Sequence, residues 1–466
     1  MTMTRLLPED VLAQQILRRL APRDLAVSRC VCAEWKVAVD GRRLLRRDLL
    51  PLSVGGIFLN IDAQRYTELF RPSSSSSSSY SGDFTHLLDN PDTVVGHCNG
   101  LVLFYGCVVA NPATGWFAPI PPRPTWNPHQ VAHLVFDPAV SSSHYSVFLV
   151  NYATLYDDKN KINAAAAATE EEEEEEWPPC HYPLHVFSSA TGRWEERPFL
   201  RQGDAAGPIA AVRPGKRVDG SVDRCFAAYW KQALYVHCRN NFFFRISLSR
   251  DEYRVIKPPP GITVHSDGLV FGKSEKGPYL AESRYYADCC FKVWILDDHH
   301  QWVLRHCNKH LGMMLPRCYL DNKVRPAGPW VLEDINYKDD LKYWDEETAR
   351  LGLMEITTRE TAAAKQQQPP HFDEDAGGFT LDSTSPDEAN DDGTSCYVHY
   401  FEVFGFHPYK EIVFLGSRLR IAMAYDLNSH KFQYLDSIWP TDYNFFYGCG
   451  YVMETFVYTP CKLDPN

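Results

Sequence analysis

Residues 6–48 read LLPEDVLAQQILRRLAPRDLAVSRCVCAEWKVAVDGRRLLRRD, the pattern of a small cluster of helices. Pro8 suits a first helical turn, because its missing N–H would have no partner there in any case. An apolar stripe with three-and-four helical spacing follows, at Leu12, Ile16, Leu17 and Leu20. The pattern predicts three short helices, the second beginning near Pro22 and the last ending near Gly41.

So short a segment has more apolar side chains than it can bury by itself. A bundle of about 40 residues encloses little apolar surface, and small domains commonly need a partner for stability. The surplus indicates either docking on another protein or a helical cap on the rest of this chain. The helical pattern alone leaves both interpretations open.

The same stretch resembles an F-box. The shared features are Leu-Pro-Glu-Asp at 7–10, Ile-Leu-x-x-Leu at 16–20 and Cys-Val-Cys-x-x-Trp at 30–35. Two positions depart from the F-box pattern, Ala21 and Glu34, and neither is a core position. The resemblance implies binding to the Skp-type adaptor of cullin–RING (SCF) ubiquitin ligases. It further implies that the joint core of F-box and adaptor comprises Leu7, Pro8, Ile16, Leu17, Leu20, Leu25, Val31 and Trp35.

The bulk composition favours a larger β-rich region behind these helices. The chain has 466 residues, which is too many for one small domain, and its 25 Tyr, 25 Phe and 11 Trp favour strands. No apolar run is long enough for a transmembrane helix, and the start lacks the pattern of a secretion signal. Fourteen cysteines without regular spacing indicate reduced thiols. We therefore expect a cytoplasmic and/or nuclear protein that does not bind membranes.

The net charge of −12 comes largely from two acidic segments, residues 170–176 and 373–392. Such segments favour solubility and say little about the charge of a binding partner. The one basic cluster, residues 42–47, is expected to be a solvated helix end. The sequence therefore gives no support to nucleic-acid binding.

From residue 94 onward, a pattern of strand, polar turn and aromatic-led strand recurs. The turn at Asn99-Gly100 is a strong hairpin signal. Five copies of the closing pattern are found, at residues 108–117, 186–194, 244–256, 293–304 and 424–435. Repeats of three or four strands are typical of propeller blades, whereas a β-sandwich gives many short strands without this repeating closure. We expect six blades, with five to seven allowed.

The sixth blade has no clear repeat of its own. Residues 330–335 and 351–356 are candidates for its strands, and strand pairs near 55–66 or 448–458 are candidates for closing the ring. The expected fold is α+β multidomain, with a three-helix F-box at 1–50 and a mainly-β, kelch-like propeller at 94–460. A linker with a serine-rich loop would span 51–93. Two insertions, at 157–179 and 361–395, are polar or low in complexity and are expected to be disordered.

This second region also resembles a known family. Residues 97–101, 111–114, 136–142 and 293–296 resemble the F-box-associated propeller region of the large plant F-box families, especially those of grasses. The resemblance supports the propeller architecture and the adaptor role. It does not identify a target, and the sequence assigns no residues to target binding. Two aromatic residues of long loops, Trp126 and Tyr156, are as much packing candidates as binding candidates.

A search for catalytic, cofactor and metal motifs leads to the expectation that there are none. Residues 268–274 (GLVFGKS) fall one residue short of a phosphate-binding loop and are predicted to form a β-turn. His306 and His310 have the spacing of a metal-binding helix, but the glutamate of a zinc protease is absent. Adjacent Cys289 and Cys290 would point to opposite faces of a strand, which does not suit one metal ion.

The leading hypothesis is a substrate-recognition subunit of an SCF ubiquitin ligase. The adaptor would bring in cullin and RING subunits, and the propeller would hold an unidentified target protein. One alternative is an F-box and propeller scaffold without ligase function. A second is an enzyme, for example a glycan-processing one, which would need paired carboxylates in the central channel.

Overall fold

The structure is a computed structural model. It describes residues 54–73, 80–85, 93–124, 130–151, 176–208, 226–238, 242–262, 268–283, 291–311, 328–338, 401–441, 443 and 452–465, apart from 139, 142, 310, 418–420 and 462, and in the N-terminal part 16, 17, 20, 28, 31–42 and 44. Its contacts divide the chain into one unit of residues 1–336 and 399–466 and a second unit of residues 337–398. The fold described below belongs to the first unit.

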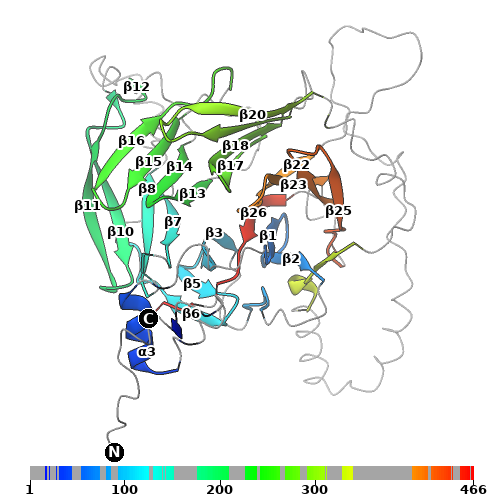
Figure 1. Cartoon of the computed structure of the whole chain (residues 1–466), viewed down its shortest axis with the longest axis horizontal. Helices are drawn as coiled ribbons and strands as arrows, with labels where there is room; N and C mark the ends of the chain where they lie inside the picture. The colour runs from blue at the N-terminus through cyan, green and yellow to red at the C-terminus, as the bar shows by residue number, and fades with distance from the viewer. Residues whose placement is uncertain are drawn as a thin grey trace, which may run out of the picture. The chain divides into compact units, whose positions relative to one another are not determined.

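One helix of the N-terminal segment is described, α3 (Ala33–Gly41), shown in blue in Figure 1. Glu34 lies in its first turn, where a negative charge favours the positive end of the helix dipole. The other two helices that the sequence predicts fall almost entirely outside the described residues. No described helix is long and apolar enough to cross a membrane.

The rest of the described chain is mostly β, as predicted. Its strands form successive antiparallel groups of four in chain order. The first group comprises β3 (Val94–Cys98), β4 (Leu101–Phe104), β5 (Val108–Asn111) and β6 (Trp116–Pro119). The second comprises β7 (Gln130–Phe136), β8 (Tyr145–Asn151), β10 (His181–Ser188) and β11 (Arg193–Arg201). The third comprises β13 (Ala227–Trp230), β14 (Ala233–Cys238), β15 (Phe242–Ser247) and β16 (Glu252–Ile256).

Two further groups follow the same order. The fourth comprises β17 (Leu269–Ser274), β18 (Gly277–Ser283), β19 (Phe291–Leu296) and β20 (Trp302–Asn308). The fifth comprises β22 (Glu402–Phe406), β23 (Ile412–Ser417), β24 (Ile421–Asp426) and β25 (Phe432–Asp436). Each of the five closing patterns read from the sequence coincides with the last two strands of one group, because those strands are joined by short polar turns.

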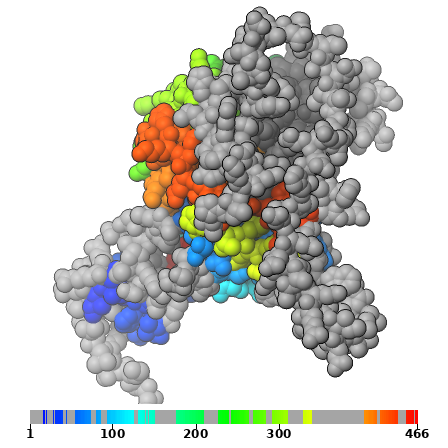
Figure 2. Space-filling model, turned by 90° about the vertical axis from the view of Figure 1, so that its right-hand side faces the viewer, coloured from blue at the N-terminus to red at the C-terminus, as the bar shows by residue number. Residues whose placement is uncertain are grey.

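The sixth group is assembled from three separated parts of the chain. Its order is β21 (Trp330–Leu332), β2 (Glu68–Pro72), β1 (Gly56–Ile61) and β26 (Val452–Tyr458). Figure 2 shows the surface of this sheet, where residues near 330, in yellow-green, lie beside residues near 70, in blue. The candidates near 55–66, 448–458 and 330–335 therefore meet in one sheet, whereas residues 351–356 lie outside the described ones.

The second and third groups are joined into one eight-stranded sheet. The join is a short parallel pairing of their last strands, in which Leu200 lies opposite Glu252 and Arg201 opposite Tyr253. Strand β11 is nine residues long, so it extends past its partner β10 and reaches β16. Nothing in the repeating pattern predicted this pairing, since it links strands of different repeats.

The first strands of the five consecutive groups, together with β26 of the sixth, surround a common centre, shown in Figure 1. Strand β3 contacts β7 and β26, and β17 contacts β13 and β22, while β22 also contacts β26. The strands next to these innermost ones are buried on both faces: all six residues of β1 and all seven of β18 are buried. Outer strands such as β6 alternate half-buried and exposed residues, because one face meets solvent.

Two segments that the sequence assigned to a linker and an insertion contain strands. The expected linker at 51–93 contains β1 and β2, which pair along their length with each other and, through β1, with β26. The described end of the insertion at 157–179 contains β9 (Glu176–Trp177), which pairs with β12 (Gly207–Pro208). The insertion at 361–395 lies outside the described residues.

Candidate functional site

The structure describes five of the eight residues expected at the adaptor interface. Leu17 is fully buried at 0% exposure, whereas Val31 is 61% exposed. Ile16, Leu20 and Trp35 are partly buried against the hydrophobic cluster that includes Leu17. The other three, Leu7, Pro8 and Leu25, lie outside the described residues. Within this set, Leu17 belongs to the interior of the protein, whereas the side chain of Val31 faces solvent.

Helix α3 presents one buried and one exposed apolar surface. Ala38 and Val39 are buried at 1% and 0% exposure, whereas Val37 is 64% exposed. Val31, just before the helix, is the other large apolar residue that is strongly exposed in the described part of this segment. Sequence reasoning did not single out Val37, because an apolar stripe does not say which of its members the rest of the chain covers.

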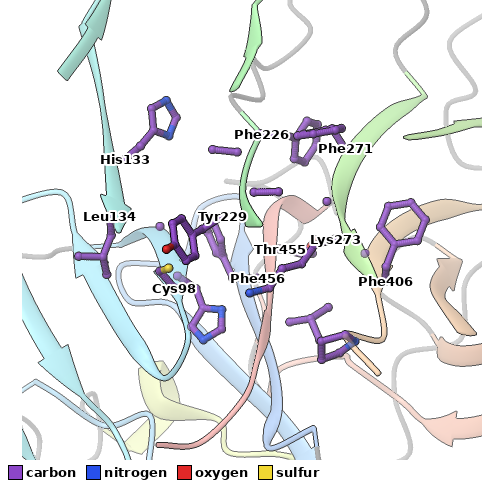
Figure 3. Close-up of a pocket in the computed structure, with 18 of the residues that line it drawn as sticks. Cys98, His133, Leu134, Phe226, Tyr229, Phe271, Lys273, Phe406, Thr455 and Phe456 are labelled. Atoms are coloured by element: carbon purple, nitrogen blue, oxygen red, sulfur yellow. The ribbon is translucent and has the colours of Figure 1, made fainter. Parts of the chain in front are cut away.

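A second candidate site lies at the centre of the six groups of strands, where a pocket of about 130 Å³ is lined mainly by residues of β3, β7, β13, β17, β22 and β26. Its apolar lining includes five phenylalanines, Phe226, Phe271, Phe404, Phe406 and Phe456. Figure 3 shows His133 and Leu134 on one side of this space and Phe271 and Phe406 on the other. Sequence reasoning placed a channel here but assigned none of its residues.

The turn between β3 and β4 directly follows Cys98, which lines the pocket. Asn99 and Gly100 have φ values of 48° and 100°, and Cys98 pairs with Leu101 across the turn. This confirms the predicted hairpin. Gly100 is also required by packing, since a Cβ there would lie 2.2 Å from the Cβ of Cys461.

Polar contacts tie this turn to two other sheets. The Asn99 side-chain amide donates to the carbonyl oxygen of Phe136, at the end of β7, over 2.7 Å. The Phe136 N–H donates to the Cys98 sulfur at 3.2 Å. Lys273 Nζ, from β17, donates to Asn99 Oδ1 at 2.8 Å. The turn thereby connects the first, second and fourth groups of strands at the centre.

The position of Lys273 corrects one prediction. Residues 268–274 were expected to form a β-turn, but Leu269–Ser274 is strand β17, paired along its length with β18. The glycine-rich pattern is therefore part of a strand, and the lysine contacts an amide of a neighbouring sheet. A phosphate-binding loop leads into the N-terminus of a helix. A strand has no such helix N-terminus, which is consistent with the expectation that this segment is not a phosphate-binding loop.

Burial shifts the pKa values of three titratable side chains in the pocket lining, His97, His133 and Cys98. Burial and, to a smaller extent, the positive charge of Lys273 together lower the pKa of His97 to about 3. Burial also lowers the pKa of His133 to about 3. Burial raises the pKa of the Cys98 thiol, although Lys273 opposes this shift. Both imidazoles and the thiol are therefore neutral near pH 7, which leaves Lys273 and Glu454 as the charged side chains of the lining.

Of the two histidines considered for metal binding, the structure describes His306, and it is not on a helix. His306 lies in strand β20, and its Nε2 is 3.3 Å from the Tyr425 hydroxyl. Burial lowers the pKa of His306 to about 4. Among the residues that the structure describes, no three His, Cys, Asp or Glu side chains gather as metal ligands. His310, Cys289, Cys290 and the loop aromatics Trp126 and Tyr156 lie outside those residues.

A comparison with known protein families matches residues 6–47 to the F-box domain. An F-box domain is therefore present in the segment for which the sequence pattern indicated one. F-box domains bind Skp-type adaptors, which bring in cullin, and their presence indicates a role in substrate recognition by SCF-type ubiquitin ligases. Proteins with such a domain are generally non-catalytic adaptors. No curated protein matches this chain.

Proposed function

We propose that this protein is the substrate-receptor subunit of an SCF ubiquitin ligase. The observation that carries the proposal is the F-box domain at residues 6–47. In this assignment the N-terminal segment docks on the Skp-type adaptor, and the six groups of strands receive a target protein. The complex acts in the cytoplasm, the nucleus or both.

The six groups of strands act as the blades of a β-propeller of the kind found beside F-boxes in plant proteins. Support comes from their order around one centre and from the sheet that joins β1 and β2 to β26. A receptor of this kind needs no catalytic group of its own. It raises the effective concentration of the target near a ubiquitin-loaded conjugating enzyme.

Among the adaptor contacts of this proposal, the exposed valines Val31 and Val37 of the N-terminal segment can be tested by substitution. Val31 and Val37 are more than half exposed, so their substitution leaves the interior of the free chain unchanged. Large apolar residues that are exposed in a free protein are typical of surfaces that bind partners. Leu17 is a poorer probe because it is fully buried, and a charge there disturbs folding and docking together.

Co-expression with a plant Skp-type adaptor tests the docking step. We expect the wild-type chain to elute with the adaptor as a one-to-one complex in size exclusion, and Val31→Glu to weaken that complex. Val140→Glu is the matched control, because Val140 is 47% exposed and lies outside the F-box. Elution of the wild-type chain separately from every adaptor tried would contradict the proposal.

Ubiquitin transfer tests the ligase step. We expect a partner captured by the strand region to be ubiquitinated in a reconstituted complex of adaptor, cullin, RING subunit and conjugating enzyme. Transfer should fail when Val31→Glu is used in place of the wild-type chain. A partner that stays bound and unmodified in the intact complex would favour the scaffold alternative.

A further inference from the structure

Two arginines lie directly opposite each other on neighbouring strands of the third group. Arg245 of β15 pairs in register with Arg254 of β16, so both side chains project from the same face of the sheet. Arg254 is exposed and Arg245 is half-buried. Like charges placed directly opposite each other destabilise a sheet. Folding of the chain alone therefore does not account for this pair.

No carboxylate pairs with either arginine in the described part of the chain. Arg245 Nε donates to the hydroxyl of Tyr235, its cross-strand neighbour on β14, at 3.3 Å. Among the described residues, the remaining N–H groups of Arg245 have no acceptor, and Arg254 forms no hydrogen bond or ion pair. Both guanidinium groups therefore have donors available for a ligand.

The acidic side chains of this region have other positions or partners. Asp298 Oδ1 accepts from Lys231 Nζ at 2.7 Å, and Asp297 Oδ1 accepts two backbone N–H groups of its own turn. Glu252 lies on the same face of β16 as Arg254, two residues away, and the structure as described gives it no ion pair. These carboxylates reduce the net positive charge without neutralising the two arginines directly.

The arginine pair lies where the third group of strands meets the fourth. Burial, followed by the charges of Arg245 and Arg254, lowers the pKa of His300, which belongs to the turn between β19 and β20. Trp302, at the start of β20, donates its indole N–H to the carbonyl oxygen of Lys257, just after β16, at 2.8 Å. A ligand held by the arginines therefore meets surfaces of two groups.

A phosphate group suits two adjacent arginines better than a carboxylate does. A phosphorylated side chain carries about −1.5 to −2 charge near pH 7 and has three acceptor oxygens, whereas a carboxylate carries a single charge. Guanidinium groups present their N–H donors in a planar fork that contacts phosphate oxygens in pairs. One phosphate between the two guanidinium groups also offsets the repulsion between them.

We propose that Arg245 and Arg254 bind a phosphorylated side chain of the target protein. This inference rests on the proposed role as a substrate receptor, and it names the chemical group by which the target is recognised. The phosphate oxygens accept hydrogen bonds from both guanidinium groups. Because Arg254 is exposed, a segment of another protein can reach the pair from solvent.

A panel of peptides tests the proposal on the full-length protein without adaptor. The probes are an alanine-based pentapeptide with a central phosphoserine and the same peptide with serine in that place. Isothermal titration calorimetry should show binding of the phosphoserine peptide, with the serine peptide about tenfold or more weaker. Equal affinities, or no binding of the phosphoserine peptide, would overturn the proposal. Inorganic phosphate that binds as tightly as the phosphoserine peptide would overturn the assignment to a protein side chain.

Substitutions then assign the contact to the arginines. Arg254→Gln and Arg245→Gln should each weaken binding of the phosphoserine peptide about tenfold or more. Arg254→Lys should restore only part of the affinity, because lysine keeps the charge but lacks the planar fork. Arg193→Gln is the matched control, since Arg193 is an exposed arginine of β11 in the second group.

Thermal unfolding of each variant shows whether it is folded. Arg254→Gln is the cleaner variant, because Arg245 also contacts Tyr235. Unchanged affinity for the phosphoserine peptide in folded Arg254→Gln or Arg245→Gln protein would refute the proposal. Co-elution of the chain with an adaptor, without binding of the phosphoserine peptide, would refute this inference and leave the receptor role intact. Binding of that peptide by a chain that joins no adaptor would support the phosphate site and contradict the receptor role.

Discussion

Lys273 Nζ and Asn99 Oδ1 form a 2.8 Å hydrogen bond between residues 174 positions apart in the chain. The bond joins strand β17 to the turn that follows β3, and the same asparagine donates to the carbonyl oxygen of Phe136. One side chain thus contacts three groups of strands where their first strands approach the centre. These contacts are among several side-chain hydrogen bonds that join neighbouring groups of strands, in addition to apolar packing.

Removal of the Asn99 side chain should destabilise the protein. Asn99→Ala loses two hydrogen bonds and places alanine at a φ of 48°, so we expect a loss of about 2 kcal/mol in the free energy of unfolding. Asn99→Gly tolerates the backbone conformation and should lose only the hydrogen-bond part. Urea denaturation measures both variants, and an Asn99→Ala variant as stable as wild type would contradict this role.

Gly100 should tolerate substitution less well than an ordinary turn glycine. Gly100→Ala combines a φ of 100° with a Cβ 2.2 Å from Cys461, so we expect a loss of about 3 kcal/mol in unfolding free energy. Gly115→Ala is the control, because Gly115 also has a positive φ, of 76°, but its Cβ would meet nothing within 4 Å. That variant should lose only about 1 kcal/mol, and equal losses would rule out the packing argument.

Leu17 and Val31 should respond differently to a negative charge. Leu17→Asp buries a carboxylate at a position with 0% exposure, and we expect it to lower the unfolding free energy of the free chain by about 3 kcal/mol or more. Val31→Glu should leave that stability within about 0.5 kcal/mol, because its side chain is 61% exposed. Denaturation of the two variants without adaptor provides the measurement, and equal stability would contradict the burial of Leu17.

His133 should make stability depend on pH. Its pKa is about 3 in the folded protein and near 6.5 in an unfolded chain, so the unfolded state binds more protons between these values. Stability should therefore fall as the pH is lowered from 6.5 toward 3, by up to about 1.4 kcal/mol per pH unit from this residue. His133→Asn should show a shallower decline between pH 7 and pH 5 in urea denaturation, and an unchanged slope would exclude His133 as the cause.

The features that the sequence predicted correctly depend on neighbouring residues. The Asn99-Gly100 hairpin follows from two residues that tolerate positive φ, and the five closing patterns follow from strands joined by short turns. The F-box was recognised in the same way, because its motifs occupy one short segment. In contrast, residues 268–274 were misread as a turn, since two glycines outweighed the strand-forming Leu269, Val270 and Phe271 between them.

The sequence by itself therefore determined the F-box segment, the β-rich character and the five repeats that carry the closing pattern, because these are encoded by spacing and turn chemistry over short distances. Only the tertiary structure decided that β21, β2, β1 and β26 share a sheet and that β11 pairs with β16. It also decided which apolar residues are covered, as with Leu17 and Val31, and which side chains meet at the pocket. These features depend on contacts between distant segments, whose partners are chosen by packing of the whole unit.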